Sequence, residues 1–157
     1  MVLTAPAVPA RARVVIVGGG IIGCSVAYHL AHAGWDVVLL ERDKLTSGTT
    51  WHAAGLMVTF GSTSETSTWM RKYSCDLYER LEQETGQHTG FKRTGFIEIA
   101  ADADRLEEYR RVSAFNRLMG IDVPELSPAQ ANELLPPAPV DDAPPGPSVP
   151  RDGRAAP

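Results

Sequence analysis

The sequence predicts an α/β fold, and three patterns near its start carry this prediction. Val14 to Val17 form an apolar, β-branched run that ends at a glycine, which is typical of a strand buried on both faces of a parallel sheet. From Ile21 to Ala33 apolar residues recur every three or four positions, which predicts a helix that ends at Gly34. A second apolar run, Val37 to Leu40, predicts the next strand. Residues 13–41 are therefore expected to form one right-handed βαβ unit.

Weaker patterns follow along the rest of the chain. Thr, Ser and Gly residues without a sustained period predict an unusually long loop over residues 42–61. The other expected elements are a helix from the capping-box spacing of Ser62 to Glu65 up to Gly86, a half-exposed antiparallel strand over 94–101, a helix from Asp104 to Gly120, and a short helix from Ser127 to Leu135.

Composition divides the chain into three parts. Residues 1–12 are an Ala/Pro-rich leader, residues 13–135 can fold, and residues 136–157 hold eight of the 12 prolines and no aromatic, Leu or Ile residue. Such a tail cannot build an apolar core, so we expect it to be disordered or to come from a shifted reading frame. Because a parallel sheet needs helices on both faces and only one crossover helix is predicted, residues 13–135 are expected to be an incomplete domain.

Composition also excludes several classes of protein. A net charge of -4 without Lys/Arg clusters offers no surface for nucleic acid or for an anionic membrane. No apolar run reaches the roughly 18 residues that span a bilayer, and the leader lacks the apolar stretch of a secretion signal, which predicts a cytoplasmic protein. Cys24 and Cys75 stand far apart without a CxxC or His/Cys cluster, so we expect neither a disulfide framework nor a metal site.

A glycine motif marks the junction between the first predicted strand and the first predicted helix. Gly18, Gly20 and Gly23 form G-x-G-x-x-G. The first glycine permits a tight turn, the second lets a pyrophosphate approach the backbone, and the third lets the helix pack closely on the strand. Ile21 and Ile22 then offer free amide N–H groups and the positive end of the helix dipole to the phosphates.

Glu41 closes the second predicted strand, 18 residues after Gly23. Its carboxylate can accept hydrogen bonds from both ribose hydroxyls of an adenosine. The same negative charge would repel a 2′-phosphate, so NADP is disfavoured. Together these residues predict a Rossmann-like dinucleotide site, although the motif alone does not separate FAD from NAD.

The loop after the second predicted strand favours FAD over NAD, because its sequence resembles that of a known family. Residues 47–56, SGTTWHAAGL, taken with VVIVGGGIIGCSVAYHLAHAGWDVVLLERD before them and YSCDLYERLEQETGQHTGFKRTGFIEIA after them, resemble the dimethylglycine and sarcosine dehydrogenase family. This family is a branch of the FAD-dependent amine oxidoreductases of the D-amino-acid oxidase superfamily. The resemblance covers residues 13–135. It implies FAD, oxidative N-demethylation of a small N-methyl amino acid such as sarcosine or dimethylglycine, and formaldehyde or a folate-bound one-carbon unit as the second product.

The same resemblance implies roles for individual residues. His52 corresponds to a histidine that is joined covalently to the flavin, and Glu41 and Arg42 are expected at the adenosine. Family members are several times longer, and their substrate-contacting residues lie beyond this chain, so neither a catalytic residue nor the electron acceptor is assigned. The remaining residues that the resemblance implies lie along the ribityl chain and the flavin ring: Ser47, Gly48, Thr49, Thr50, Ala53, Gly55 and Leu56.

Three alternatives stay open at the level of sequence. The same branch of the superfamily includes a non-catalytic relative, the regulatory subunit of pyruvate dehydrogenase phosphatase. The βαβ unit by itself also fits a plain NAD-binding module. The third alternative is an inactive gene fragment, because the chain is short and its tail is rich in proline. Taken alone, the chain is expected to lack amine dehydrogenase activity.

Overall fold

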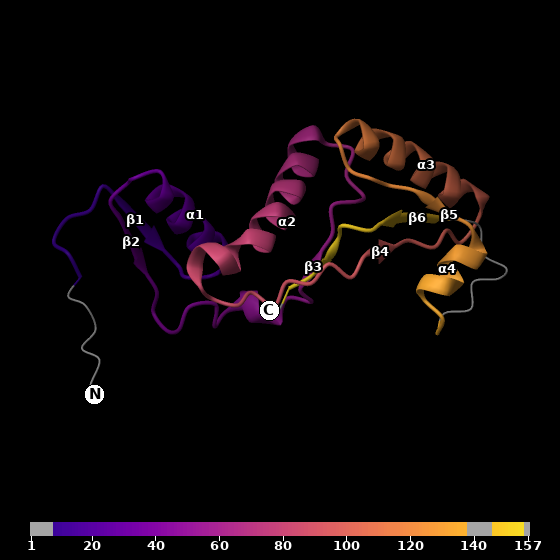
Figure 1. Cartoon of the computed structure of the whole chain (residues 1–157). Coiled ribbons are helices and arrows are strands. Elements are labelled where there is room, and N and C mark those ends of the chain that lie inside the picture. The colour runs from indigo at the N-terminus through magenta and orange to yellow at the C-terminus, as the bar shows by residue number, and fades with distance from the viewer. Residues whose placement is uncertain (1–7, 138–145, 156–157) are drawn as a thin grey trace. The chain divides into compact units, whose positions relative to one another are not determined.

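The computed structural model describes residues 8–137 and 146–155 (Figure 1). The chain divides into two compact units, one that ends at Ala54 and one that begins at Gly55. Each unit has its own secondary structure and is described separately.

The first unit is the expected βαβ unit. Strand β1, Val14–Val17, leads into helix α1, Ile21–His32, and strand β2, Val37–Leu40, returns parallel to β1. The register pairs Val14 with Val37 and Val17 with Leu40. These elements confirm the α/β prediction and the boundaries taken from the apolar pattern. The expected loop that follows contains one short 3₁₀ helix, Thr49–His52.

Helix α1 covers one face of this two-stranded sheet. Ile16 points toward the helix, because a β-carbon on Gly23 would lie 3.4 Å from its Cγ2 atom. Side chains alternate along a strand, so Val15 and Val17 point the other way, and they are 54% and 85% exposed. The described part of the first unit therefore leaves one apolar sheet face open to solvent, as expected for an incomplete parallel sheet.

The described part of the second unit is a mixture of short antiparallel strands and three helices (Figure 1). In chain order the elements are β3 Leu56–Met57, α2 Glu65–Thr85, β4 Phe96–Ile97, α3 Ala103–Leu118, β5 Glu125–Leu126, α4 Pro128–Leu134, β6 Gly146–Val149 and β7 Gly153–Arg154.

Strand β6 is the central strand of a three-stranded sheet in this unit. It pairs antiparallel with β4 on one side and with β5 on the other, while β7 pairs antiparallel with β3. Helix α3 packs against β6. The apolar core between them holds Phe60, Ile121, Val123 and Val149, with Tyr109 of α3 packed against it. The predicted antiparallel strand within 94–101 is thus confirmed as β4.

The caps of two helices each lie two residues away from the predicted cap. Ser64, not Ser62, caps α2 by accepting a hydrogen bond from the N–H of Ser67, since the Ser62 hydroxyl instead bonds to the backbone of Ser64. Asp102 replaces the expected Asp104 as the cap of α3, and its carboxylate accepts the N–H of Arg105 at 2.7 Å. The capping box at Ser127 is confirmed.

The expectation of a disordered tail is wrong for residues 146–155, which form β6 and β7. The part of that expectation that falls on residues 138–145 and 156–157 lies outside the described residues. The four residues of β6 are buried although only Val149 is a larger aliphatic residue. A β-carbon on Gly146 would lie 1.9 Å from the carbonyl oxygen of Glu98, so this strand is ordered by close main-chain pairing. Amino-acid composition does not predict the order of such a strand, because main-chain hydrogen bonds need no apolar side chain.

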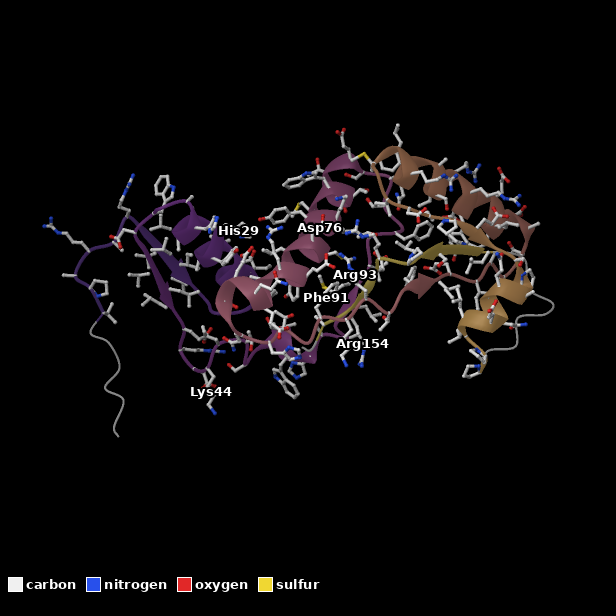
Figure 2. All side chains as sticks on the ribbon, in the orientation of Figure 1. His29, Lys44, Asp76, Phe91, Arg93 and Arg154 are labelled. Carbon is white, nitrogen blue, oxygen red and sulfur yellow. The ribbon has the colours of Figure 1, made fainter. Side chains whose placement is uncertain are left out.

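A set of ion pairs ties α2 to the chain segments beside it. Arg93 lies next to Asp76 and Phe91 (Figure 2), with 4.0 Å between its Nη2 and an oxygen of Asp76. Its guanidinium also bonds to both carboxylate oxygens of Glu79 and to the carbonyl of Arg151. This bidentate pair lowers the pKa of Glu79, and both groups are charged at neutral pH.

A buried carboxylate joins the start of the second unit to its end. Asp152 is fully buried, and its two oxygens accept the N–H of Thr59 at 2.9 Å and the hydroxyl of Thr59 at 2.6 Å. Burial raises the pKa of Asp152, while the hydrogen bonds from Thr59 oppose that shift. This carboxylate fixes the segment after β3 to the turn before β7.

Replacing Asp152 by alanine should lower the free energy of unfolding of the second unit. The N–H and hydroxyl of Thr59 would be left buried without an acceptor, which costs about 1–3 kcal/mol. Urea denaturation followed by circular dichroism measures this loss. Asp122→Ala, at an exposed aspartate, is the matched control and should change stability by less than about 0.5 kcal/mol. Equal stability of the two variants would contradict the role given to Asp152.

Candidate dinucleotide-binding site

The turn between β1 and α1 depends on a glycine conformation. Gly18 has a φ of 107°, a region that residues with a β-carbon rarely adopt. Its N–H donates to the carbonyl of Leu40 at 2.8 Å, which ties the turn to the end of the neighbouring strand. The chain can then reverse sharply and start α1 at Ile21.

The third glycine of the motif sets how closely α1 approaches β1. A β-carbon on Gly23 would lie 1.9 Å from the carbonyl oxygen of Gly18, a distance that no side chain tolerates. A β-carbon on Gly20 would lie 3.2 Å from the hydroxyl oxygen of Thr50, so this position is tight but not closed. Each glycine therefore occupies the place that the motif predicts for it.

The N-terminus of α1 is arranged to receive an anion. Gly20 is the N-cap and brings no side chain, and the first turn contains no acidic residue. The N–H of Ile21 donates to the Thr50 hydroxyl at 3.0 Å, and Ile22 is 78% exposed. The first N–H groups of a helix lack partners within the helix, and they carry the positive end of its dipole. Phosphate oxygens are the natural acceptors at such a site.

Glu41 lies against the phosphate-binding turn and not only at the end of β2. One carboxylate oxygen accepts the N–H of Gly19 at 2.7 Å, and the other accepts the N–H groups of Arg42 and Asp43 at 2.7 and 3.1 Å. These bonds, with Gly19 first, lower the pKa of Glu41, so the carboxylate is charged at neutral pH. A fixed negative charge at this place can accept ribose hydroxyls and disfavours a 2′-phosphate.

Gly19 is a site residue that the motif does not mark, since it occupies a variable position of G-x-G-x-x-G. It is buried, its N–H binds Glu41, and its carbonyl accepts the N–H of Thr46 at 2.8 Å. A β-carbon there would lie 2.5 Å from Cδ2 of Leu45. The sequence signal for this role was that Gly19 is the middle of three consecutive glycines, where the motif allows any residue.

The loop after β2 folds back onto the turn. Thr46 adopts a positive φ of 63° where its N–H meets Gly19, and Thr50 reaches the start of α1. His52 is exposed, its Nδ1 lies 3.1 Å from the carbonyl of Gly48, and its ring lies 4.1 Å from that of Trp51. With Nδ1 as the donor, the lone pair of a neutral imidazole is on Nε2.

The structure brings together part of the expected set. Gly18, Gly20, Gly23, Glu41 and Thr50 meet around the start of α1. The other expected residues of the first unit lie on its exposed surface: Arg42, Ser47, Gly48, Thr49 and Ala53. Gly55 and Leu56, the last two residues of the expected set, belong to the second unit. There the carbonyl of Gly55 accepts the N–H of Ala155, and Leu56 of β3 pairs with Arg154 of β7.

This geometry agrees with a family match over nearly the whole chain. A family described as DAO, FAD dependent oxidoreductase, matches residues 13–157. The chain belongs to the DAO family of FAD-dependent oxidoreductases. The match continues through the proline-rich segment, including β6 and β7.

The curated relatives of this chain include both dehydrogenases and a regulatory subunit. Human sarcosine dehydrogenase is 41% identical over 92% of this chain, and rat dimethylglycine dehydrogenase is 43% identical over 80% of it. The mouse pyruvate dehydrogenase phosphatase regulatory subunit is 47% identical over 83% of the chain. The chain spans 15–16% of the length of these three proteins.

Solved structures of DAO proteins share the fold. L-Proline dehydrogenase from P. horikoshii superposes on 95% of the chain with a TM-score of 0.87 and 25% identity. Glycine oxidase from Geobacillus kaustophilus covers 92% of the chain with a TM-score of 0.76 and 28% identity. The chain covers 39% and 40% of those two structures.

The residues present fit the ADP half of FAD. The cradle at Gly18, Gly20 and Gly23 leaves backbone space for a pyrophosphate, and Glu41 places a charged acceptor beside it. Within the described ranges, no group of three or more His, Cys, Asp or Glu side chains could hold a metal ion, and no helix is long and apolar enough to cross a membrane.

Gly23→Ala should destabilise the first unit by about 1–3 kcal/mol, because the added methyl group would overlap the carbonyl oxygen of Gly18. Amide hydrogen exchange in β1 and β2 measures this loss unit by unit. Lys44→Ala, at an exposed lysine of the same unit, is the control and should change stability by less than about 0.5 kcal/mol. Unchanged protection of β1 in Gly23→Ala would show that α1 does not need this close approach.

Proposed function

We propose that this chain is the FAD-binding part of a flavoenzyme that oxidises a small N-methyl amino acid, such as sarcosine or dimethylglycine, by hydride transfer to FAD. The observation that carries the proposal is the glycine cradle with Glu41 hydrogen-bonded to its rim, in a chain of the DAO family. Identities of 41% and 43% to a sarcosine and a dimethylglycine dehydrogenase support this substrate class.

In this proposal the chain's own residues bind and orient the cofactor. The N–H groups at Ile21 and Ile22 bind the pyrophosphate, and the hydroxyl of Thr50 shifts from the N–H of Ile21 to a phosphate oxygen. Glu41 accepts the ribose hydroxyls. FAD supplies the acceptor for hydride, and the protein holds and tunes it.

His52 is proposed as the point of covalent attachment. Its Nδ1 bond to the carbonyl of Gly48 leaves Nε2 as the nucleophile toward the 8α-methyl carbon of the flavin. The new N–C bond would replace one methyl C–H bond and the imidazole N–H bond. Both protons would pass to solvent, and the two electrons would pass through the flavin to dioxygen, which would be reduced to hydrogen peroxide. The bond would prevent loss of the cofactor and withdraw electron density from the ring, which favours hydride acceptance from an amine.

Gly20→Val should abolish FAD binding, because its β-carbon alone comes within 3.2 Å of Thr50 and the larger side chain fills the phosphate position. We expect at least a tenfold rise in the dissociation constant, read from quenching of flavin fluorescence. Glu41→Gln keeps one acceptor and should cost only about 1–2 kcal/mol of binding. Equal FAD affinity in wild type and Gly20→Val would exclude the cradle as the binding site.

The covalent bond is tested in a protein that contains this sequence and has the full length of the dehydrogenase relatives. Acid precipitation should carry yellow colour into the pellet, and His52→Ala should move the colour to the supernatant while noncovalent binding persists. His29→Ala, at an α1 histidine, is the control and should leave the colour in the pellet. Equal release of colour from wild type and His52→Ala would leave His52 without a covalent role.

A regulatory role is the second candidate, because the mouse phosphatase regulatory subunit is 47% identical over 83% of the chain. Both candidates share the FAD site and differ in turnover. Oxidation of sarcosine or dimethylglycine with an artificial electron acceptor, by an enzyme of the relatives' full length, supports the dehydrogenase. FAD binding without any such turnover supports the regulatory role.

A further inference from the structure

The loop after β2 contains a backbone conformation that its sequence does not favour. Thr46 has a φ of 63°, and within the described ranges it is the only residue other than glycine with a positive φ. A β-branched residue is an outlier in this left-handed region, because its side chain crowds the backbone. Such outliers persist where surrounding contacts hold them, and they concentrate at ligand-binding and switch segments.

Main-chain contacts hold Thr46 in this conformation. Residues 44–47 form a turn in which the N–H of Ser47 donates to the carbonyl of Lys44 at 3.2 Å. Thr46 is the third residue of this turn, a position where a positive φ normally selects glycine or asparagine. Its N–H donates to the carbonyl of Gly19 at 2.8 Å, whereas its hydroxyl has no hydrogen bond to any described residue. The group that this turn fixes is therefore the backbone N–H of Thr46.

The carbonyl that Thr46 binds belongs to the peptide between Gly19 and Gly20. That peptide bond is trans, so its C=O and N–H point in opposite directions. The N–H of Gly20 therefore points away from Thr46, and no acceptor in the described part of the chain binds it. By contrast, the next N–H, that of Ile21, is bonded to the hydroxyl of Thr50.

The two glycines do not themselves select this orientation. Gly20 has a φ of −76°, and rotating the peptide by about 180° would change it to about 104°, which glycine tolerates about equally well. Glu41 holds the N–H of Gly19 and so fixes only the preceding peptide. The thiol of Cys24 also approaches the Gly19 carbonyl, at 3.4 Å, but S–H is a weak donor. The strong contact that decides the orientation is the one from Thr46.

We propose that Thr46 is a positioning residue for the dinucleotide site. By holding the Gly19 carbonyl, it fixes the peptide between Gly19 and Gly20 so that the N–H of Gly20 can donate to a phosphate oxygen. The assignment of that phosphate to FAD rests on the proposed function, and the orientation of the peptide rests on the contact between Thr46 and Gly19. A donor fixed in advance loses little further freedom on binding, so this contact should raise affinity.

The test is a titration of the ¹⁵N-labelled 157-residue chain with ADP, followed at the amide of Gly20. Thr46→Pro removes the N–H and forces a negative φ, so ADP should bind at least about tenfold more weakly. The Gly20 amide should also broaden, because its peptide samples both orientations. Thr46→Gly keeps the N–H and the positive φ without the side chain, so it should bind ADP within about twofold of wild type. A side chain needed only for packing would instead be missed in both variants.

Two further variants are controls. Lys44→Gly introduces a glycine into the same loop at an exposed side chain (Figure 2) and should bind ADP as wild type does. Cys24→Ala removes the weaker donor to the Gly19 carbonyl and should weaken binding by less than about twofold. If Thr46→Pro does not fold by circular dichroism, Thr46 is replaced by its α-hydroxy acid analogue. The ester of that analogue lacks only the N–H, and the same loss of affinity is expected.

Equal ADP affinity in wild type and in the variant without the N–H would overturn the role of Thr46 and leave the FAD assignment standing. A loss in Thr46→Gly as large as that in Thr46→Pro would also overturn it, because the side chain and not the N–H would then be required. No saturable binding of ADP to wild type would contradict the proposed function itself, and with it any role of Thr46 at that site.

Discussion

The close approach of α1 to β1 is the constraint on which the binding site depends. Gly23 lies against the carbonyl of Gly18, and any side chain at position 23 would push the helix away. The helix N-terminus could present its N–H groups to a phosphate only while this contact exists. The positive φ of Gly18 and the bond from its N–H to Leu40 position the same turn on the sheet.

Glu41 connects this turn to the adenosine end of the proposed site. Because its carboxylate accepts the N–H of Gly19, the charge that would read the ribose is fixed by the loop that would bind the phosphates. The contact also lowers the pKa of Glu41, which keeps the acceptor ionised as pH falls below neutral. In the proposed site, phosphate binding and selection against a 2′-phosphate would thus both depend on the contact between Glu41 and Gly19.

The βαβ unit could be predicted because its signals are local: apolar runs, helical spacing and three glycines with a conformational requirement each. The role of Gly19 could not, since it depends on a contact with a residue 22 positions away. Strand β6 was missed because its order comes from pairing with β4 and β5, which apolar composition does not report.

The central claim, that the turn from Gly18 to Gly23 together with Glu41 binds the ADP half of FAD, is tested most directly by titrating the ¹⁵N-labelled chain with ADP. Saturable shifts should concentrate at the amides of Gly19, Gly20 and Ile22 and at Glu41, and adenosine 2′,5′-bisphosphate should bind more weakly than ADP. Shifts that do not saturate, or that leave these amides unchanged while others move, would contradict the account.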